Sequence, residues 1–226
     1  MRNPLLAAVV GAVAVISGPM ALADVTSFKF SGAGVSGTAL LTFGPNTVMG
    51  DPSGSFAITD ISGTFSDSNL GLSNVAITGL VPIDPVNPPK DAPFPASFSS
   101  FSVTNPPPPD TAISYDNLFY PGGSPITCPD YPRFGGYLDV YGVLFKLSNG
   151  YVVDLWSNGA IPGAAPLDYG VAVMDATTKI VDFQAGGLAL AVPEPGSVLL
   201  LATGLLGALG YRRRSVTSRA RVGLGD

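Results

Sequence analysis

The sequence contains no histidine, a single cysteine and a single glutamate among its 226 residues. Without histidine it cannot build a Ser-His-Asp triad, a Cys-His pair or the usual zinc site. Because Cys128 is alone, no intramolecular disulfide can form. The chain also lacks a Gly-x-Ser-x-Gly elbow and a Gly-x-x-x-x-Gly-Lys phosphate loop. Aspartate is therefore the only abundant residue type with catalytic potential.

Charge is scarce, since Asp, Glu, Lys and Arg together make up 12% of the chain. Residues 24–191 contain five basic residues and 14 aspartates, which gives this region a net charge of −9. A surface this acidic repels phosphate groups, so nucleic acid is excluded as a partner. Glycine and proline are abundant, at 28 and 22 residues, and they favour turns and short strands over helices.

Residues 24–190 are expected to form one all-β ectodomain, an antiparallel β-sandwich of jelly-roll type. Short segments rich in Phe, Val, Ile and Thr recur between turn residues, as they do in such folds. Asn149-Gly150 and Asn158-Gly159 predict two hairpin turns, because both residue types tolerate positive φ. The small residues at 185–191 predict a linker. The expected strands are residues 25–30, 37–43, 54–60, 63–66, 75–78, 137–147, 151–156, 169–174 and 180–183.

Prolines are concentrated between residues 81 and 132, where 14 of the 22 occur. The four consecutive prolines at 106–109 exclude a helix or a central strand. We therefore expect 81–132 to be a long surface connection with one strand, at 94–103.

Residues 1–23 have the pattern of a secretory signal peptide. Arg2 precedes an apolar run at 5–16, and Ala21-Leu22-Ala23 fits the small-x-small cleavage site, which makes Asp24 the expected mature N-terminus. An uncleaved N-terminal anchor is the alternative. In either case an N-terminal signal helix carries the ectodomain across the inner membrane.

The C-terminal region combines three features in a fixed order. Val192-Pro193-Glu194-Pro195 contains the only glutamate of the chain between two prolines, which keep the backbone extended. Residues 196–211 are uncharged and would form a helix of roughly 24 Å, enough for a single transmembrane helix in a thin bilayer. Arg212, Arg213 and Arg214 then mark the cytoplasmic side, and 215–226 form a cytoplasmic tail.

This order of motif, apolar span and arginine cluster at 192–214 resembles the PEP-CTERM protein-sorting signal of Gram-negative bacteria. The resemblance implies recognition by an exosortase, a membrane-embedded cysteine transpeptidase-like enzyme, with cleavage near the motif and release or attachment outside the inner membrane. It also implies transient membrane anchoring and a link to exopolysaccharide and the biofilm matrix. A plain membrane anchor, with the prolines acting only as a helix breaker, is the alternative.

These features predict an exported, non-enzymatic surface or matrix protein without a cofactor or metal site. A secreted carbohydrate-binding module is the main alternative, with its aromatic residues stacking on sugars. A histidine-free glycoside hydrolase is a further one, for which Asp139, Asp154 and Asp168 are the candidate carboxylates. Residues 67–71 begin like a calcium loop, but Thr78 stands where such a loop needs a glutamate, which leaves only an irregular oxygen-ligand site open. The candidate sugar-stacking aromatics are Tyr115, Phe119, Tyr120, Tyr131, Tyr137, Tyr141, Tyr151 and Trp156.

Overall fold

A computed structural model describes residues 24–84, 94–105, 112–160 and 167–192, and its secondary structure consists of strands and turns. The all-β prediction is confirmed, whereas the expected signal helix and transmembrane helix lie outside the described residues. Within the described ranges, no helix is long and apolar enough to cross a bilayer. The strands are β1 Asp24–Gly32, β2 Val35–Pro45, β3 Phe56–Asp67, β4 Leu72–Leu80, β5 Ser99–Ser102, β6 Ala112–Tyr115, β7 Leu118–Phe119, β8 Val143–Leu147, β9 Val152–Gly159, β10 Asp168–Met174 and β11 Ile180–Ala191.

The main sheet closes on itself into an eight-stranded barrel, so the prediction of a sandwich is wrong. Going round the barrel, the strands follow in chain order, β1, β2, β3, β4, β8, β9, β10 and β11, and β11 pairs with β1. All of these pairings are antiparallel, and β7 adds a short pair at the end of β3. Sandwich and barrel strands show the same alternation of apolar and polar residues, so the sequence pattern does not distinguish the two folds.

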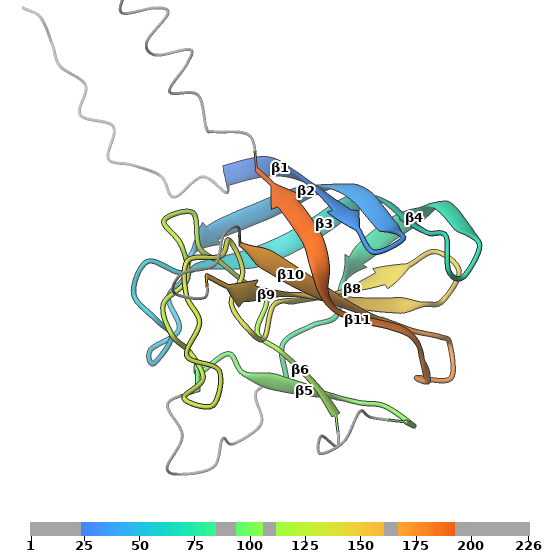
Figure 1. Ribbon diagram of the computed structural model, residues 1–226. Coiled ribbons are helices and arrows are strands. Elements are labelled where there is room, and N and C mark those ends of the chain that lie inside the picture. The colour runs from blue at the N-terminus through green and yellow to red at the C-terminus, as the bar shows by residue number, and fades with distance from the viewer. Residues whose placement is uncertain (1–23, 85–93, 106–111, 161–166, 193–226) are drawn as a thin grey trace, which may run out of the picture.

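The two ends of the barrel differ. At one end, the turn end, tight turns join β1 to β2, β3 to β4, β8 to β9 and β10 to β11. At the other end, the loop end, β1 begins and β11 finishes, and the longer connections β2–β3, β4–β8 and β9–β10 are found there (Figure 1). The N-terminus of β1 and the C-terminus of β11 therefore lie at the same end of the barrel.

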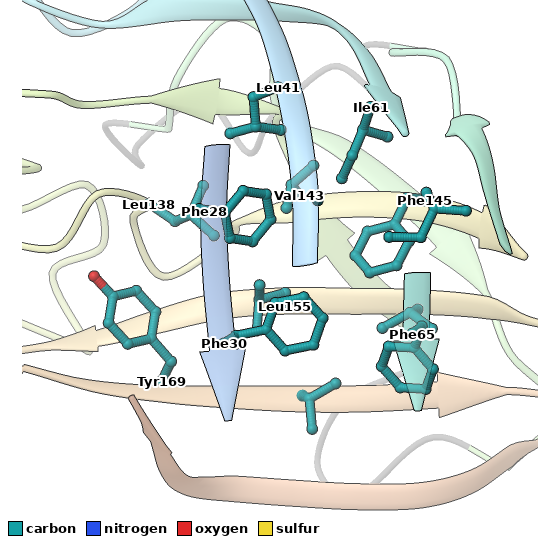
Figure 2. Packing of buried hydrophobic residues seen from close by; sticks show 14 of the residues in the cluster. Phe28, Phe30, Leu41, Ile61, Phe65, Leu138, Val143, Phe145, Leu155 and Tyr169 are labelled. Atoms are coloured by element: carbon teal, nitrogen blue, oxygen red, sulfur yellow. The ribbon is translucent and has the colours of Figure 1, made fainter. Parts of the chain in front are cut away.

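The barrel interior is filled by large apolar side chains from every strand of the ring. Phe28 and Phe30 of β1 face Phe65 and Phe145, with Leu155 and Tyr169 beside them (Figure 2). Successive aromatic rings lie 5.7–6.4 Å apart, the range in which tilted and edge-on contacts are favourable. Alternation along each strand explains this packing, because every second side chain points inward.

The connection between β4 and β8 covers the outside of the barrel. The β5–β6 hairpin contributes Ile113 and Tyr115, which pack against Leu144, Ala172 and Met174 on the outer faces of β8 and β10. Strand β8 is thus buried on both faces, and it begins at 143 rather than at the predicted 137. The prediction that 81–132 is only a surface connection is wrong, because its apolar residues complete this second core.

Two further local predictions are wrong. Residues 157–159 do not turn but continue β9, where Asn158 donates hydrogen bonds to the Asp168 carboxylate (3.2 Å) and to the Ala185 carbonyl (2.6 Å). The small residues at 185–191 are no linker but the second half of β11, with Leu188 buried in the core. Pairing with β1 and β10 outweighs the weak strand propensity of this stretch. The predicted turn at 149–150 is confirmed, and the two strands predicted at 54–60 and 63–66 form one strand, β3.

Candidate functional site

The described chain reaches the first residue of the predicted sorting motif. Strand β11 ends at Ala191, which pairs with Lys29 of β1, and Val192 follows it directly. The Val192 side chain is half-buried against the core and lines a small apolar hollow at the loop end with Phe28, Leu41, Phe119, Tyr137, Leu138 and Leu190. The motif therefore starts at the barrel wall with no intervening linker.

The first strand overhangs the last one at this end. Asp24, the predicted mature N-terminus, begins β1 and pairs with Phe43 of β2. Strand β11 pairs with β1 only up to Lys29. Residues 24–28 of β1 therefore pair with β2 but not with the described part of β11. The predicted cleavage residues Ala21 and Ala23, the motif residues Pro193, Glu194 and Pro195, and Arg212, Arg213 and Arg214 all lie outside the described residues, so their predicted roles stay predictions.

Exposed apolar side chains occur on the loops of the loop end. The β2–β3 loop presents Met49, which is 95% exposed, next to Val48. In the connection that leads to β8, Ile126, Tyr131 and Phe134 are also exposed, and Phe134 forms a bridge with Ala160 after the end of β9. This end of the barrel therefore combines the start of the sorting motif with solvent-exposed apolar groups.

The candidate carboxylates occupy two different environments. Asp139 and Asp154 are 2% and 3% exposed, whereas Asp168 is half-buried and accepts hydrogen bonds from Asn158 and from the Gly187 amide. Burial, and then the charge of Asp139, raises the pKa of Asp154 well above its ordinary value. Asp139 belongs to the β4–β8 connection itself, and both Asp139 and Asp154 are buried away from the surface.

The structure brings Asp139 together with Asp116, a residue that the sequence analysis did not select. Asp139 accepts hydrogen bonds from the Tyr141 and Gly142 amides and from the Tyr120 hydroxyl, at 2.9–3.3 Å. Burial, and then the neighbouring Asp139 charge, raises the pKa of Asp116 well above its ordinary value. Asp116 Oδ1 accepts the Leu118 amide, whereas its Oδ2 atom is buried without a hydrogen-bond partner beside Asp139.

Asn117 next to this pair was also missed. Its amide donates to the Val81 carbonyl and accepts from the Leu144 amide, both at 2.9 Å, and its own φ is +54°. The only signal in the sequence was the aromatic-flanked Tyr-Asp-Asn-Leu-Phe-Tyr stretch at 115–120 in a region otherwise interrupted by prolines. Asp116 and Asn117 fix the connection to the barrel and serve its structure.

The candidate sugar-stacking aromatics are mostly buried. Tyr115, Tyr120 and Tyr141 are 1–6% exposed, while Tyr131 is exposed. On the outer face, Trp156 lies over Gly170, where a Cβ atom would come within 2.2 Å of the indole. Trp156 also lies beside the exposed ring of Phe183, with 5.6 Å between ring centroids. These two residues form the aromatic shelf, the described surface pair best suited to stacking.

No group of three or more His, Cys, Asp or Glu side chains that could hold a metal ion occurs in the part of the chain that the structure describes.

A family model for the PEP-CTERM protein-sorting motif matches residues 191–214. The chain carries a PEP-CTERM sorting signal. The match begins at Ala191, the last residue of β11, and it confirms the resemblance inferred from residues 192–214. The PEP-CTERM motif indicates an exported protein that is anchored transiently in the membrane and sorted by an exosortase. No curated protein and no solved structure matches the chain.

Proposed function

We propose that this chain is an exported surface or matrix protein in which the barrel is the exported domain and the C-terminal segment is a cleavable sorting signal. The observation that carries the proposal is the sorting motif beginning on the last residue of the strand that closes the barrel. In this proposal the barrel has no catalytic role of its own and contributes structure or adhesion within an exopolysaccharide matrix.

The geometry of the loop end constrains how the precursor sits at the membrane. Between Val192 and the apolar span at 196–211 there are only three residues, which reach about 10 Å when fully extended. A precursor anchored by that span therefore holds the loop end of its barrel close to the bilayer surface. The exposed Met49 and Val48 side chains on that end suit contact with the interface.

Pro193 gives the motif a physical reason to remain outside the barrel. Continuing β11 past Ala191 would pair residues 192–196 with the overhanging residues 24–28 of β1. Proline has no amide hydrogen for such a ladder, and the second proline follows two residues later. In this proposal the prolines keep the motif from joining the barrel, so that an exosortase can bind it.

The proposal is tested by replacing Glu194 or Pro195 with alanine in the native host and following the protein in membrane and extracellular fractions. Both variants are expected to accumulate as unprocessed precursor in the membrane fraction. Ala189→Ser, an exposed position of β11 two residues before the matched segment, is the matched control and is expected to mature normally. Normal maturation of both motif variants would rule out the sorting role.

The aromatic shelf of Trp156 and Phe183 favours carbohydrate binding as a second candidate function. The two rings lie side by side on the outer face of the barrel, and Asn158 donates a hydrogen bond to Asp168 nearby, so polar groups border the apolar surface. Polysaccharide pull-down with the Trp156→Ala and Phe183→Ala variants tests this candidate. Phe134→Ala, which removes an exposed aromatic ring that is not among the sugar-stacking candidates, is the control. If both shelf variants bind as well as the unaltered protein, the shelf has no part in binding.

A further inference from the structure

The turn end of the barrel carries a cluster of oxygen-bearing side chains at its mouth. Asp67 is the last residue of β3, and it pairs with Val35, which points into the core. Asp182 of β11 pairs with Val173, and Gln184 pairs with Val171; both of these valines also point inward. Because paired residues share a face of the sheet, all three polar side chains point into the turn-end mouth.

The two carboxyl groups of this cluster lie against each other without a basic partner. Asp182 lies close enough to Asp67 for the two carboxylates to repel each other, and no lysine or arginine is among the described groups that act on Asp67. Burial, and then repulsion from the Asp182 carboxylate, raises the pKa of Asp67. Two carboxylates in contact need a shared proton or a cation between them.

One oxygen of Asp67 has no partner. Its Oδ1 atom accepts the amides of Asn69 and Leu70, at 2.8 and 3.4 Å. Its Oδ2 atom has no hydrogen bond, and the whole residue is buried, at 0% exposed. An unpartnered buried carboxylate oxygen destabilises the fold, so the fold gains stability if a ligand reaches this atom.

Further oxygen atoms converge on the same place from the neighbouring turns. The side-chain amide of exposed Asn69 contacts Asp182 Oδ2 at 3.0 Å and the Ala33 carbonyl at 3.2 Å. Turning this amide by 180° would present its Oδ1 atom instead of its nitrogen. Gln184 contacts Asp182 Oδ1 at 2.7 Å. The cluster thus gathers groups from the β1–β2 turn, the β3–β4 turn and β11.

We propose that the turn end of the barrel binds one calcium ion through the carboxylates of Asp67 and Asp182 and the side-chain amide oxygen of Asn69. The Ala33 carbonyl and water complete the shell of six to eight oxygens that calcium takes. All of these donors are oxygen atoms in an irregular arrangement, which suits calcium better than the strict octahedron of magnesium. The ion would join two turns to the closing strand β11 and remove the repulsion between the two carboxylates.

The test uses the full-length chain, purified in detergent, stripped with EDTA and then titrated with calcium chloride. We expect one bound ion per chain by equilibrium dialysis, with half-saturation at about 0.1–1 mM, the range of extracellular calcium modules. At 10 mM calcium the melting temperature is expected to rise by about 5 °C. Magnesium at the same concentration is expected to give a smaller rise.

Asp67→Asn and Asp182→Asn should each abolish the calcium-dependent rise. Both substitutions keep the size of the side chain, and the second changes a half-buried residue, so at least one variant is expected to fold. Asp175→Asn is the matched control, since Asp175 is likewise a half-buried aspartate, in the β10–β11 turn at the same end. Its calcium response should be unchanged.

Three results would overturn the proposal. The first is a melting temperature of the unaltered chain that does not respond to calcium up to 10 mM. The second is undiminished calcium binding by both variants, because the ion would then bind elsewhere. The third is stabilisation of the calcium-free protein by Asp182→Asn together with no ion uptake by the unaltered chain, because the two carboxyl groups would then be sharing a proton.

Discussion

Replacement of Asn117 by alanine is expected to lower the free energy of unfolding by more than the loss of one hydrogen bond, because this residue of the β4–β8 connection makes several stabilising contributions. The side chain makes two hydrogen bonds of 2.9 Å, one to the Val81 carbonyl and one from the Leu144 amide. Leu144 is 0% exposed, so its amide would lose its partner away from water. In addition, alanine would have to adopt a φ of +54°, which asparagine tolerates better.

These terms give a rough magnitude. An unpaired buried amide costs about 1–3 kcal/mol, the lost carbonyl partner about 1 kcal/mol, and the left-handed backbone about 1 kcal/mol, or roughly 3–5 kcal/mol in total. The free energy of unfolding is measured by urea titration with the fluorescence of Trp156, the only tryptophan. Asn74→Ala is the matched control, because Asn74 has a φ of +49° but is exposed, so it should cost only about 1 kcal/mol. If Asn117→Ala costs no more than Asn74→Ala, the account of the connection is wrong.

Three further predictions concern the barrel. Burial raises the folded-state pKa values of Asp116 and Asp154. The stability that these two groups contribute is therefore complete below pH 3.8 and is lost as the pH rises through the raised pKa values. Urea titrations from pH 4 to pH 8 should show a declining free energy of unfolding. Asp154→Asn should flatten this decline and stabilise the protein at pH 8, and an unchanged slope would argue against a buried carboxyl group there. Gly63→Ala should lower the free energy of unfolding by about 3 kcal/mol or more, because the φ of Gly63 is +144° and the new Cβ would meet the Thr38 carbonyl. Gly54→Ala is the control and should cost about 1 kcal/mol, because Gly54 has a φ of +83° but nothing close to its Cβ position. Equal costs in urea titrations would mean that β2 and β3 are not as close as the pairing indicates.

The strands of the barrel could largely be predicted from the sequence because their side chains alternate. Residues 37–43 and 169–174 combine this alternation with β-branched and aromatic residues, and both are strands. Closure into a barrel could not be predicted, because it depends on the pairing of β1 with β11, which are separated by most of the domain. The second half of β11 is rich in alanine and glycine and has weak strand propensity by itself.

The sorting signal and the buried polar residues show opposite limits of sequence reasoning. The signal at 192–214 is contiguous, so its three parts are evident from their order along the chain. Asp116 and Asp139 are 23 residues apart, and Asp67 and Asp182 are much further apart, so only the folded chain brings each pair together. No feature of the sequence around Asp116 distinguishes it from the exposed aspartates, so its burial beside Asp139 could not be predicted.

The mass of the mature protein, recovered from outside the inner membrane of the native host, tests the central claim most directly. We expect a chain that begins at Asp24 and ends near the Pro-Glu-Pro motif, without the apolar span at 196–211 and the arginine cluster. Recovery of that chain with its barrel intact would support the view that the C-terminal segment is an address removed after export. An extracellular protein that retains residues 196–226 would contradict it.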